Sequence, residues 1–235
     1  MIQFYAPDIA INPVLPESDS QHCVRVLRAR QGDTIEVIDG KGHRYTCRLI
    51  DAHPKHAMVE ITECHNVPLC WSYELTVAVA PTKLMDRMEW LVEKLTEIGV
   101  NRIVPIRCTH SERKELKTER LEKIAISAMK QSLKTVMPQI LPLTNAGEFI
   151  ASCQSQQRFI AYCDVDIPRQ ILAKQIQPNL DTAIMIGPEG DFTTDEIKAA
   201  FQADFRPVSL GDNRLRTETA ALVAADTVHI INQFH

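Results

Sequence analysis

A short loop near residue 190 combines glycine, proline and a carboxylate, a combination typical of backbone that approaches a ligand. Gly187 and Gly190 flank Pro188 and Glu189, directly after the apolar run Ile184–Ile186. Because glycine lacks a Cβ atom, backbone at such positions can come close to a bound molecule. Glu189 would add a proton acceptor beside it. A plain turn between a strand and a helix has the same composition, so this loop alone leaves both interpretations open.

A second loop, Leu210–Leu215, also follows a strand-like run and leads into a predicted helix that begins near Thr217. Glu218 suits the positive end of the helix dipole, whereas a cation such as Arg216 is disfavoured there. An arginine held against the dipole indicates a side chain that faces a ligand, although solvated surface arginines are more common. Neither loop matches the G-x-G-x-x-G dinucleotide fingerprint or the G-x-x-x-x-G-K-S/T phosphate loop, so nicotinamide and nucleoside-triphosphate enzymes lose their usual support.

The elements that position these loops alternate between strands and helices. This alternation predicts an α/β fold with a largely parallel sheet, and such sheets bind ligands at the carboxyl ends of their strands. Gly99 is a predicted helix end, and Thr193 with Glu196 forms a capping box at a helix start. We predict strands at residues 75–80, 102–106, 159–163, 182–186 and 207–210, and helices at residues 85–98, 119–133, 193–201 and 217–231.

The first part of the chain has a different pattern, with short, partly alternating apolar runs separated by glycine-containing turns. One helix, from Asp19 or Ser20 to about Arg30, interrupts the predicted strands. The boundary falls in Cys64–Tyr73, which contains Pro68 and shows no clear period. We therefore predict an N-terminal β domain of residues 1–70 and a second domain of residues 71–235. The predicted N-terminal strands are Ile2–Tyr5, Thr34–Ile38, Arg44–Ile50 and Ala57–Thr62.

The charge of the chain favours a local, not a global, contact with nucleic acid. The formal net charge is -4, yet residues 83–134 carry 12 lysines and arginines against eight carboxylates. Such a stretch could be an electrostatic footprint for phosphate. Solvated helices with ion pairs, for which Glu119 and Lys123 have the right spacing, explain the same excess.

The seven cysteines indicate a reducing compartment. They are scattered, odd in number and include no C-x-x-C pair, so a secreted disulfide framework is not expected. The first ten residues lack the pattern of a signal peptide, and no run approaches the roughly 18 apolar residues that span a bilayer. We expect a cytoplasmic protein without membrane contact. His53, His56, Cys64, His65 and Cys70 do not have the spacing of a structural zinc site, so no metal is expected.

Taken together, the two loops resemble the signature of a known family. Gly187-Pro-Glu-Gly190, followed by Leu210-Gly211 and by Leu215-Arg-Thr-Glu-Thr-Ala220, is similar to that of the small-subunit ribosomal RNA (uracil-N3)-methyltransferases, the RsmE family of the SPOUT class. The resemblance covers almost the whole chain, in order. Its further parts are His22, Val26–Arg28, Gly32-Asp33, Glu93–Val100 and Gln131-Ser132 before Pro138.

The resemblance implies a SPOUT-type parallel sheet tied in a trefoil knot, preceded by a small PUA-like β-barrel domain that contacts RNA. It also implies S-adenosylmethionine as the cofactor, N3 of a uridine in 16S ribosomal RNA of the small subunit as the methyl acceptor, and a homodimer. The alanine-rich helix after Arg216 offers a face that could pack closely in such a dimer. The implied cofactor contacts are Ile186, Gly187, Pro188, Glu189, Gly190, Leu210, Gly211, Leu215, Arg216 and Thr217.

Roles for single residues follow from the chemistry that the resemblance implies. N3 of uracil is a poor nucleophile until its proton leaves, so the site must stabilise the resulting anion. We assign that stabilisation to Arg216, and the acceptance of the proton to Glu189 or Glu218. N3 lies on the Watson–Crick edge, so the uridine must be unpaired or flipped out. The predicted RNA contacts are Arg25, Arg28, Arg30, Lys130 and Lys134.

Three departures from the family pattern bear on these roles. Asp191 stands where the family usually has a second glycine, and Lys130 where it usually has glutamate. Lys134 replaces an arginine and so loses the planar guanidinium fork. Two other functions stay open: a SPOUT methyltransferase that acts on another RNA base, and an RNA-binding ribosome assembly factor without catalysis.

Overall fold

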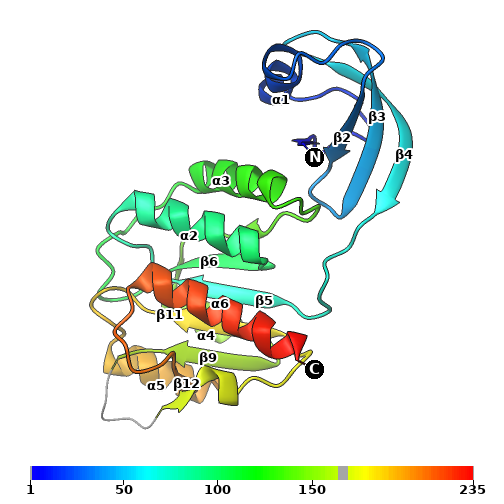
Figure 1. The fold of residues 1–235 in the computed structure, drawn as a ribbon. Coiled ribbons are helices and arrows are strands. Elements are labelled where there is room, and N and C mark those ends of the chain that lie inside the picture. The colour runs from blue at the N-terminus through cyan, green and yellow to red at the C-terminus, as the bar shows by residue number, and fades with distance from the viewer. Residues whose placement is uncertain (1, 164–168, 235) are drawn as a thin grey trace. The chain divides into compact units, whose positions relative to one another are not determined.

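The computed structural model describes residues 2–163 and 169–234 (Figure 1). The chain divides into two compact units. The N-terminal unit consists of Met1–Trp71 and Ile126–Met137, and the C-terminal unit of Ser72–Ala125 and Pro138–His235. The N-terminal unit is therefore discontinuous in sequence. It includes Ile126–Met137, a segment that lies inside the predicted second domain of residues 71–235.

A four-stranded sheet forms most of the N-terminal unit. β1 pairs with β2 in parallel, and β2–β3 and β3–β4 are antiparallel. Alternate side chains face a core that includes Phe4, Leu15, Val37 and Leu49. All four predicted strands are present, although β4 runs into the segment expected to be a linker. The strands are β1 (Gln3–Tyr5), β2 (Thr34–Ile38), β3 (His43–Asp51) and β4 (Met58–Asn66).

The helix of this unit ends earlier than predicted. α1 (Glu17–Gln21) continues into the π-helical turn η1 (His22–Val26), and the chain leaves the helix at Arg28, whose φ is 56°. The backbone N–H of Ala29 donates to the carbonyl of Cys23 at 3.0 Å, and this bond closes the end of the π-helical turn. The prediction of a helix to Arg30 was therefore wrong, because this helix end forms without glycine.

The C-terminal unit is built on a parallel sheet in the order β10-β12-β9-β11-β5-β6-β7, with β8 beside β6. Every pairing in it is parallel, which confirms the predicted fold class. The central strands β5 and β11 are buried along their whole length. The strands are β5 (Leu75–Val79), β6 (Arg102–Arg107), β7 (Gln139–Ile140), β8 (Thr144–Asn145), β9 (Gln157–Ala161), β10 (Gln170–Ile171), β11 (Thr182–Ile186) and β12 (Arg206–Ser209).

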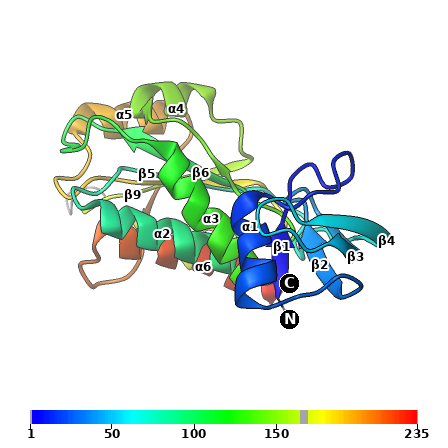
Figure 2. The same cartoon turned by 90° about the horizontal axis from the view of Figure 1, so that it is seen from above.

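Helices cover both faces of this sheet. α2 and α6 lie on one face, and α4 and α5 lie on the other (Figure 2). α2 ends at Gly99, whose φ is 105°, as predicted. In the described part of the chain, no helix has the length and apolar character that crossing a membrane requires. The helices are α2 (Met85–Ile98), α3 (Thr118–Gln131), α4 (Ala146–Ser152), the 3-10 turn η2 (Leu172–Lys174), α5 (Thr194–Gln202) and α6 (Thr217–Gln233).

Candidate active site

Both glycine-containing loops line one pocket of about 580 Å³ at the carboxyl ends of β9, β11 and β12. This volume is typical of a small-molecule site, which falls at roughly 300–1,000 Å³. The structure thus brings the two loops together, although 19 residues separate them in sequence. All ten residues predicted to contact the cofactor line this pocket: Ile186, Gly187, Pro188, Glu189, Gly190, Leu210, Gly211, Leu215, Arg216 and Thr217.

Close packing explains the glycines of the first loop. A Cβ atom on Gly187 would lie 3.0 Å from the ring of Phe192, and one on Gly190 would lie 3.1 Å from the Cβ of His110. Real Cβ atoms rarely approach other atoms so closely, so larger residues would displace the loop. His110 also holds the loop from outside, since its Nδ1 donates to the carbonyl of Gly190 at 2.9 Å.

The helix after this loop begins as the sequence predicts. Thr193 accepts a hydrogen bond from the backbone N–H of Glu196, and Glu196 accepts one from the backbone N–H of Thr193 at 2.8 Å. Thr109, in the loop after β6, also donates its backbone N–H to Glu196 at 2.8 Å. Burial alone would raise the pKa of Glu196, but these hydrogen bonds outweigh it and hold the pKa below its usual value.

The second loop is joined to the first by one side chain. The hydroxyl of Thr217, the first residue of α6, donates to the carbonyl of Gly187 at 3.1 Å. Gly211 has a φ of 114°, and apart from its own chain neighbours no atom of the residues that the structure describes lies within 4 Å of the place where its Cβ would be. Arg216 is exposed and occupies the N-cap position of α6 without capping it by its side chain. The guanidinium is thus available to the pocket that Arg216 lines.

The two candidate carboxylates have different environments. Glu189 is exposed, lines the pocket and accepts a hydrogen bond from the backbone N–H of Lys83 at 3.4 Å. Glu218 is buried beside α2, with a carboxylate oxygen 3.7 Å from Nε of Arg87, and does not line the pocket. This placement favours Glu189 over Glu218 as the group that accepts a proton from a bound molecule.

Several residues of the pocket wall were not predicted. Tyr162, Cys163 and Arg169 come from the chain after β9, which contains no glycine or motif that would indicate a site. Asp191 follows the first loop directly, and the only signal in its sequence is the departure from a glycine. The remaining polar additions from the second loop are Asn213 and Arg214.

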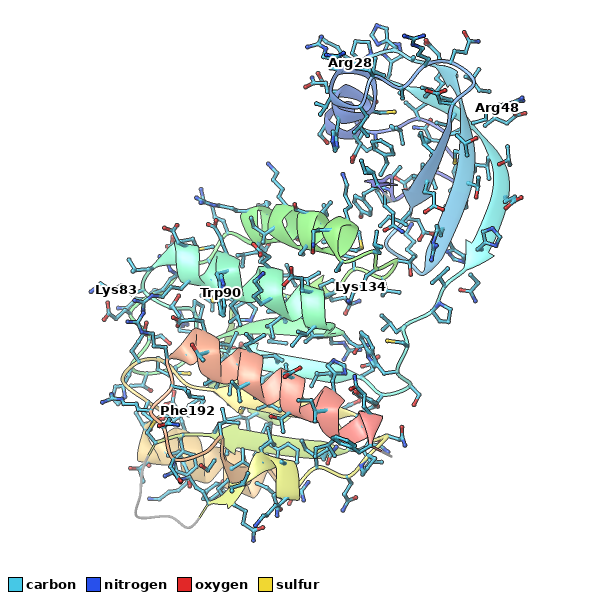
Figure 3. All side chains as sticks on the ribbon, in the orientation of Figure 1. Arg28, Arg48, Lys83, Trp90, Lys134 and Phe192 are labelled. Atoms are coloured by element: carbon cyan, nitrogen blue, oxygen red, sulfur yellow. The ribbon has the colours of Figure 1, made fainter. Side chains whose placement is uncertain are left out.

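Among the predicted RNA contacts, the arginines are exposed, whereas the lysines are paired or half-buried. Arg25, Arg28 and Arg30 are exposed on the N-terminal unit, where Figure 3 labels Arg28. Only Arg25 lies in a helical turn, so the predicted basic helix is instead a turn followed by a loop. Lys130 is held in an ion pair with the buried carboxylate of Asp19 in the same unit. Lys134 is half-buried.

Ion pairs also account for much of the basic excess between residues 83 and 134. Lys83 pairs with Glu112 at 2.9 Å, and Lys94 pairs with Glu97 at 2.8 Å. These contacts support the view that many cations of this stretch are paired with carboxylates, both on helices and in loops. Ion pairs with carboxylates are formed by Lys83, Arg87, Lys94, Arg102, Arg120 and Lys130.

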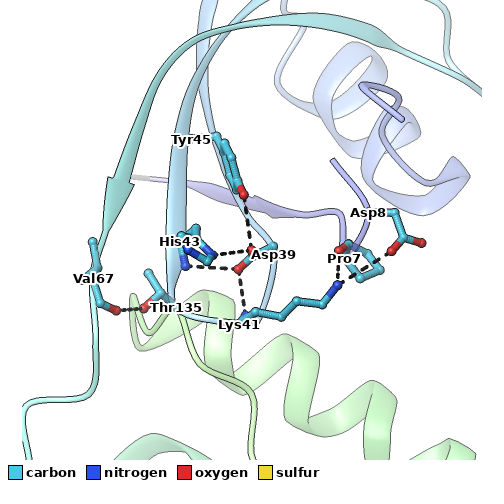
Figure 4. Close-up of polar contacts among 8 residues, drawn as sticks. All are labelled: Pro7, Asp8, Asp39, Lys41, His43, Tyr45, Val67 and Thr135. Carbon is cyan, nitrogen blue, oxygen red and sulfur yellow. Dashed lines mark hydrogen bonds and ion pairs between the residues drawn. The ribbon is translucent and has the colours of Figure 1, made fainter. Parts of the chain in front are cut away.

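A buried carboxylate organises the β2–β3 turn of the N-terminal unit (Figure 4). Asp39 accepts hydrogen bonds from the backbone N–H groups of Lys41 at 2.7 Å and His43 at 3.1 Å, and it lies 2.8 Å from Nδ1 of His43. Burial alone would raise the pKa of Asp39, but these contacts hold it below its usual value. The ammonium of Lys41 donates to the carbonyl of Pro7 at 2.9 Å. This cluster has a structural role in the turn.

Comparison with known proteins identifies the family. Residues 70–229 match the RNA methyltransferase domain, and residues 15–62 match the RNA methyltransferase PUA domain. The chain is 32% identical to a ribosomal RNA small subunit methyltransferase E from Mesomycoplasma hyopneumoniae, over 76% of this chain and 78% of the relative. It is 29% identical to the Synechocystis protein of that name, over 96% of this chain and 76% of the relative.

Solved structures agree with this assignment. A probable rRNA-methyltransferase from Porphyromonas gingivalis has a TM-score of 0.95 and 42% identity, over 100% of this chain and 99% of that one. A ribosomal RNA small subunit methyltransferase E from Neisseria gonorrhoeae, bound to S-adenosyl methionine, has a TM-score of 0.85 and 29% identity, over 98% of each chain. The resemblance to the RsmE family is thereby confirmed, and the chain belongs to the RNA methyltransferase family.

Proposed function

We propose that this protein transfers the methyl group of S-adenosylmethionine to N3 of a uridine in 16S ribosomal RNA of the small ribosomal subunit. The observation that carries the proposal is the pocket in which both glycine loops, Arg216 and Glu189 meet. Relatives over most of the chain are named ribosomal RNA small subunit methyltransferase E. The Neisseria relative was solved with S-adenosyl methionine bound, which supports the same cofactor here.

The pocket fits this cofactor in size and in lining. Within residues 2–163 and 169–234, apart from the chain neighbours of Gly211, no atom lies within 4 Å of a Cβ position on Gly211, so a ligand can approach the backbone there. Ile186, Leu210 and Leu215 add apolar surface, and Gly187–Gly190 adds backbone hydrogen-bonding groups. These residues, with Arg216 and Thr217, would hold the cofactor. When bound, it supplies a strongly electrophilic methyl group on a sulfonium.

The residues of this chain must then prepare the acceptor base. Arg216 stabilises the negative charge that develops on the uracil ring as its N3 proton leaves. Glu189, exposed at the pocket, accepts that proton directly or through a water molecule. The pocket must also hold N3 in line with the methyl group, and this placement contributes to the rate independently of acid–base chemistry.

The N-terminal unit holds RNA in this proposal. It matches a PUA domain at residues 15–62, and Arg25, Arg28 and Arg30 are exposed on it. Since Lys130 is already paired with Asp19, we give it a structural role. Lys134 stays a candidate contact. Because RNA approaches through local charge and shape, an acidic chain can still bind it.

We further propose a cytoplasmic homodimer with a knotted C-terminal unit. The alanine face of α6, which motivated the dimer, is buried within the unit at Ala221, Ala224 and Ala225. A dimer must therefore use another surface. α2 and α6 lie on one face of the sheet and expose Trp90 and Ile230, which gives an apolar candidate surface. The seven cysteines are free thiols, as a reducing compartment requires.

Mapping of modified nucleotides tests the function. Small-subunit RNA from cells with and without the protein is digested and analysed by mass spectrometry. We expect N3-methyluridine at one position only when the protein is present. A different methylated base would instead indicate another SPOUT specificity. Unchanged methylation, together with RNA binding and no cofactor binding in calorimetry, would indicate an assembly factor.

A further inference from the structure

Asp191 has an unusual backbone conformation directly after the first glycine loop. Its φ is 62°, in the left-handed region that glycine adopts freely and that other residues rarely enter. The position is one where the family pattern has glycine. A non-glycine residue persists in this conformation only where its surroundings favour it, so its side chain needs an explanation.

The carboxylate of Asp191 has two backbone partners. One oxygen accepts the N–H of Cys163 at 2.7 Å, and the other accepts the N–H of Phe192 at 2.8 Å. The main-chain carbonyl of Asp191 also accepts a hydrogen bond from Nδ1 of His110 at 3.1 Å. Cys163 follows β9 and His110 follows β6, so one residue connects the chain beyond three strands of the sheet.

This connection reaches the wall of the pocket. Tyr162 and Cys163 line the same pocket as the glycine loop, and the strand that precedes them, β9, pairs with β11. A glycine at position 191 would form the turn without strain, but it would leave the N–H of Cys163 without the carboxylate. Compared with glycine, aspartate at position 191 has a more strained backbone conformation, but its carboxylate fixes the position of the chain at Cys163.

We infer that Asp191 is a positioning residue for the cofactor: its carboxylate holds the Tyr162–Cys163 wall against the glycine loop. The inference rests on the proposed function, because it assigns the wall to binding of S-adenosylmethionine. It gives this chain a hydrogen-bonded clamp where a chain with glycine has none.

Two variants of Asp191 and one matched control test the clamp. Asp191→Gly removes both acceptors and relieves the backbone, whereas Asp191→Asn tolerates the left-handed conformation and keeps one acceptor. Asp204→Gly is the control, because Asp204 has the same φ of 62° but is exposed in the turn before β12 and does not line this pocket. Calorimetry with S-adenosylmethionine gives the affinity, and amide hydrogen exchange reports on the N–H of Cys163.

We expect Asp191→Gly to raise the Kd for S-adenosylmethionine about tenfold, as loss of a charge-assisted hydrogen bond predicts. Asp191→Asn should recover part of this loss, and Asp204→Gly should bind like the wild type. Exchange at Cys163 should accelerate in Asp191→Gly only. In turnover assays the KM for the cofactor should rise while kcat at saturation stays within about twofold.

The outcomes separate the inference from the proposed function. A wild type that binds no S-adenosylmethionine overturns the proposed function and the inference with it. A wild type that binds, with Asp191→Gly binding equally well or with unchanged exchange at Cys163, overturns the inference alone. It is also overturned if Asp204→Gly weakens binding as much as Asp191→Gly, or if Asp191→Asn binds no better than Asp191→Gly.

Discussion

Arg216 and Glu189 stand at the pocket for different reasons. Arg216 is the N-cap of α6, and it keeps its side chain free of the capping role that Ser, Thr, Asp or Asn would perform there. Glu189 is held by its place in the loop between Pro188 and Gly190 and by a long contact from Lys83. The arginine is thus placed by a helix, and the carboxylate by a loop.

Replacement of Arg216 by glutamine should lower kcat by about 100-fold, because a donor aimed at developing negative charge contributes that much in comparable sites. The affinity for S-adenosylmethionine should change much less. Single-turnover methylation of ribosomal RNA measures the first quantity, and calorimetry the second. Arg214→Gln is the matched control, since Arg214 is also exposed at the pocket. Equal losses in both variants would contradict the specific role of Arg216.

Gly211→Ala should weaken cofactor binding about tenfold, because the added methyl group enters the pocket. Any side chain at a φ of 114° is strained, so the variant should also lose about 1 kcal/mol of stability. Gly32→Ala is the control: Gly32 has a φ of 96° and equally open surroundings, but it lies in the N-terminal unit. Urea unfolding should show similar losses for both variants. Weaker cofactor binding in Gly32→Ala would show that strain alone causes the effect.

At the scale of elements, the start of α5 couples the glycine loop to its neighbours. Glu196 accepts hydrogen bonds from Thr193 at the helix start and from Thr109 in the loop after β6. The same carboxylate therefore ends one loop and holds another. The spacing of Thr193 and Glu196 predicts the first of these contacts from the sequence. The contact with Thr109 arises only in the folded chain.

Glu196→Gln should destabilise the protein by about 1 kcal/mol at pH 7, because a neutral amide oxygen accepts the hydrogen bonds of Thr193 and Thr109 more weakly than a carboxylate does. The folded-state pKa of Glu196 lies below its usual value, so its contribution is present above the unfolded-state pKa and is lost as the pH falls through the folded-state pKa. The difference between wild type and variant should therefore shrink on acidification from pH 7 to below the usual carboxyl range. Urea unfolding across this range measures it, with the exposed Asp195→Asn as control. A gap that widens in acid would contradict this account.

The sequence predicts long elements well and short ones poorly. α2 and β11 have the predicted bounds, because their apolar period and their flanking glycines act locally. β7, β8 and β10 have two residues each, and they exist only because a neighbouring strand offers hydrogen-bonding partners. The helix ends at Arg28 in a backbone conformation usual for glycine, so the residue type did not predict this helix end.

In the site, too, features with local sequence signals were predicted and features that depend on distant residues were not. The glycine loops carry signals within a few residues, and all ten predicted contacts line the pocket. Tyr162 and Cys163 enter through the pairing of β9 with β11, which joins residues more than 20 positions apart. No pattern near Tyr162 encodes that pairing. Similarly, the ion pair of Lys130 with Asp19 spans 111 positions, so the sequence alone left Lys130 as a candidate RNA contact.

At the scale of the whole molecule, RNA and cofactor are assigned to different units. Arg25→Ala with Arg28→Ala should weaken RNA binding and reduce the salt slope by roughly 1.4, because each phosphate contact on single-stranded RNA contributes about 0.7. Cofactor affinity should not change. Binding over a salt series beside calorimetry tests both. Arg48→Ala is the control, since Arg48 is also on the N-terminal unit but pairs with Glu60. An unaltered slope in the double variant would place the RNA surface elsewhere.

The proposed dimer is also a property of the whole molecule. Trp90→Glu places a charge on the exposed face of α2, where a buried interface would not tolerate it. The wild type should sediment at about twice 26.5 kDa at micromolar concentration, and the variant at the mass of one chain. Leu133→Glu, at an exposed apolar residue of the N-terminal unit, is the control. A wild type that sediments as one chain would contradict the dimer.

The discontinuity of the N-terminal unit limits how this gene can be rearranged. A fragment cut near residue 71 would lack Lys130, the partner of Asp19, and Thr135, whose hydroxyl donates to the carbonyl of Val67 at 2.6 Å. It would leave a buried carboxylate without its cation, which is costly. The first 71 residues are therefore not expected to fold as an independent domain. Recombination that grafts them onto another enzyme would have to carry Ile126–Met137 as well, so the two units are expected to be inherited together.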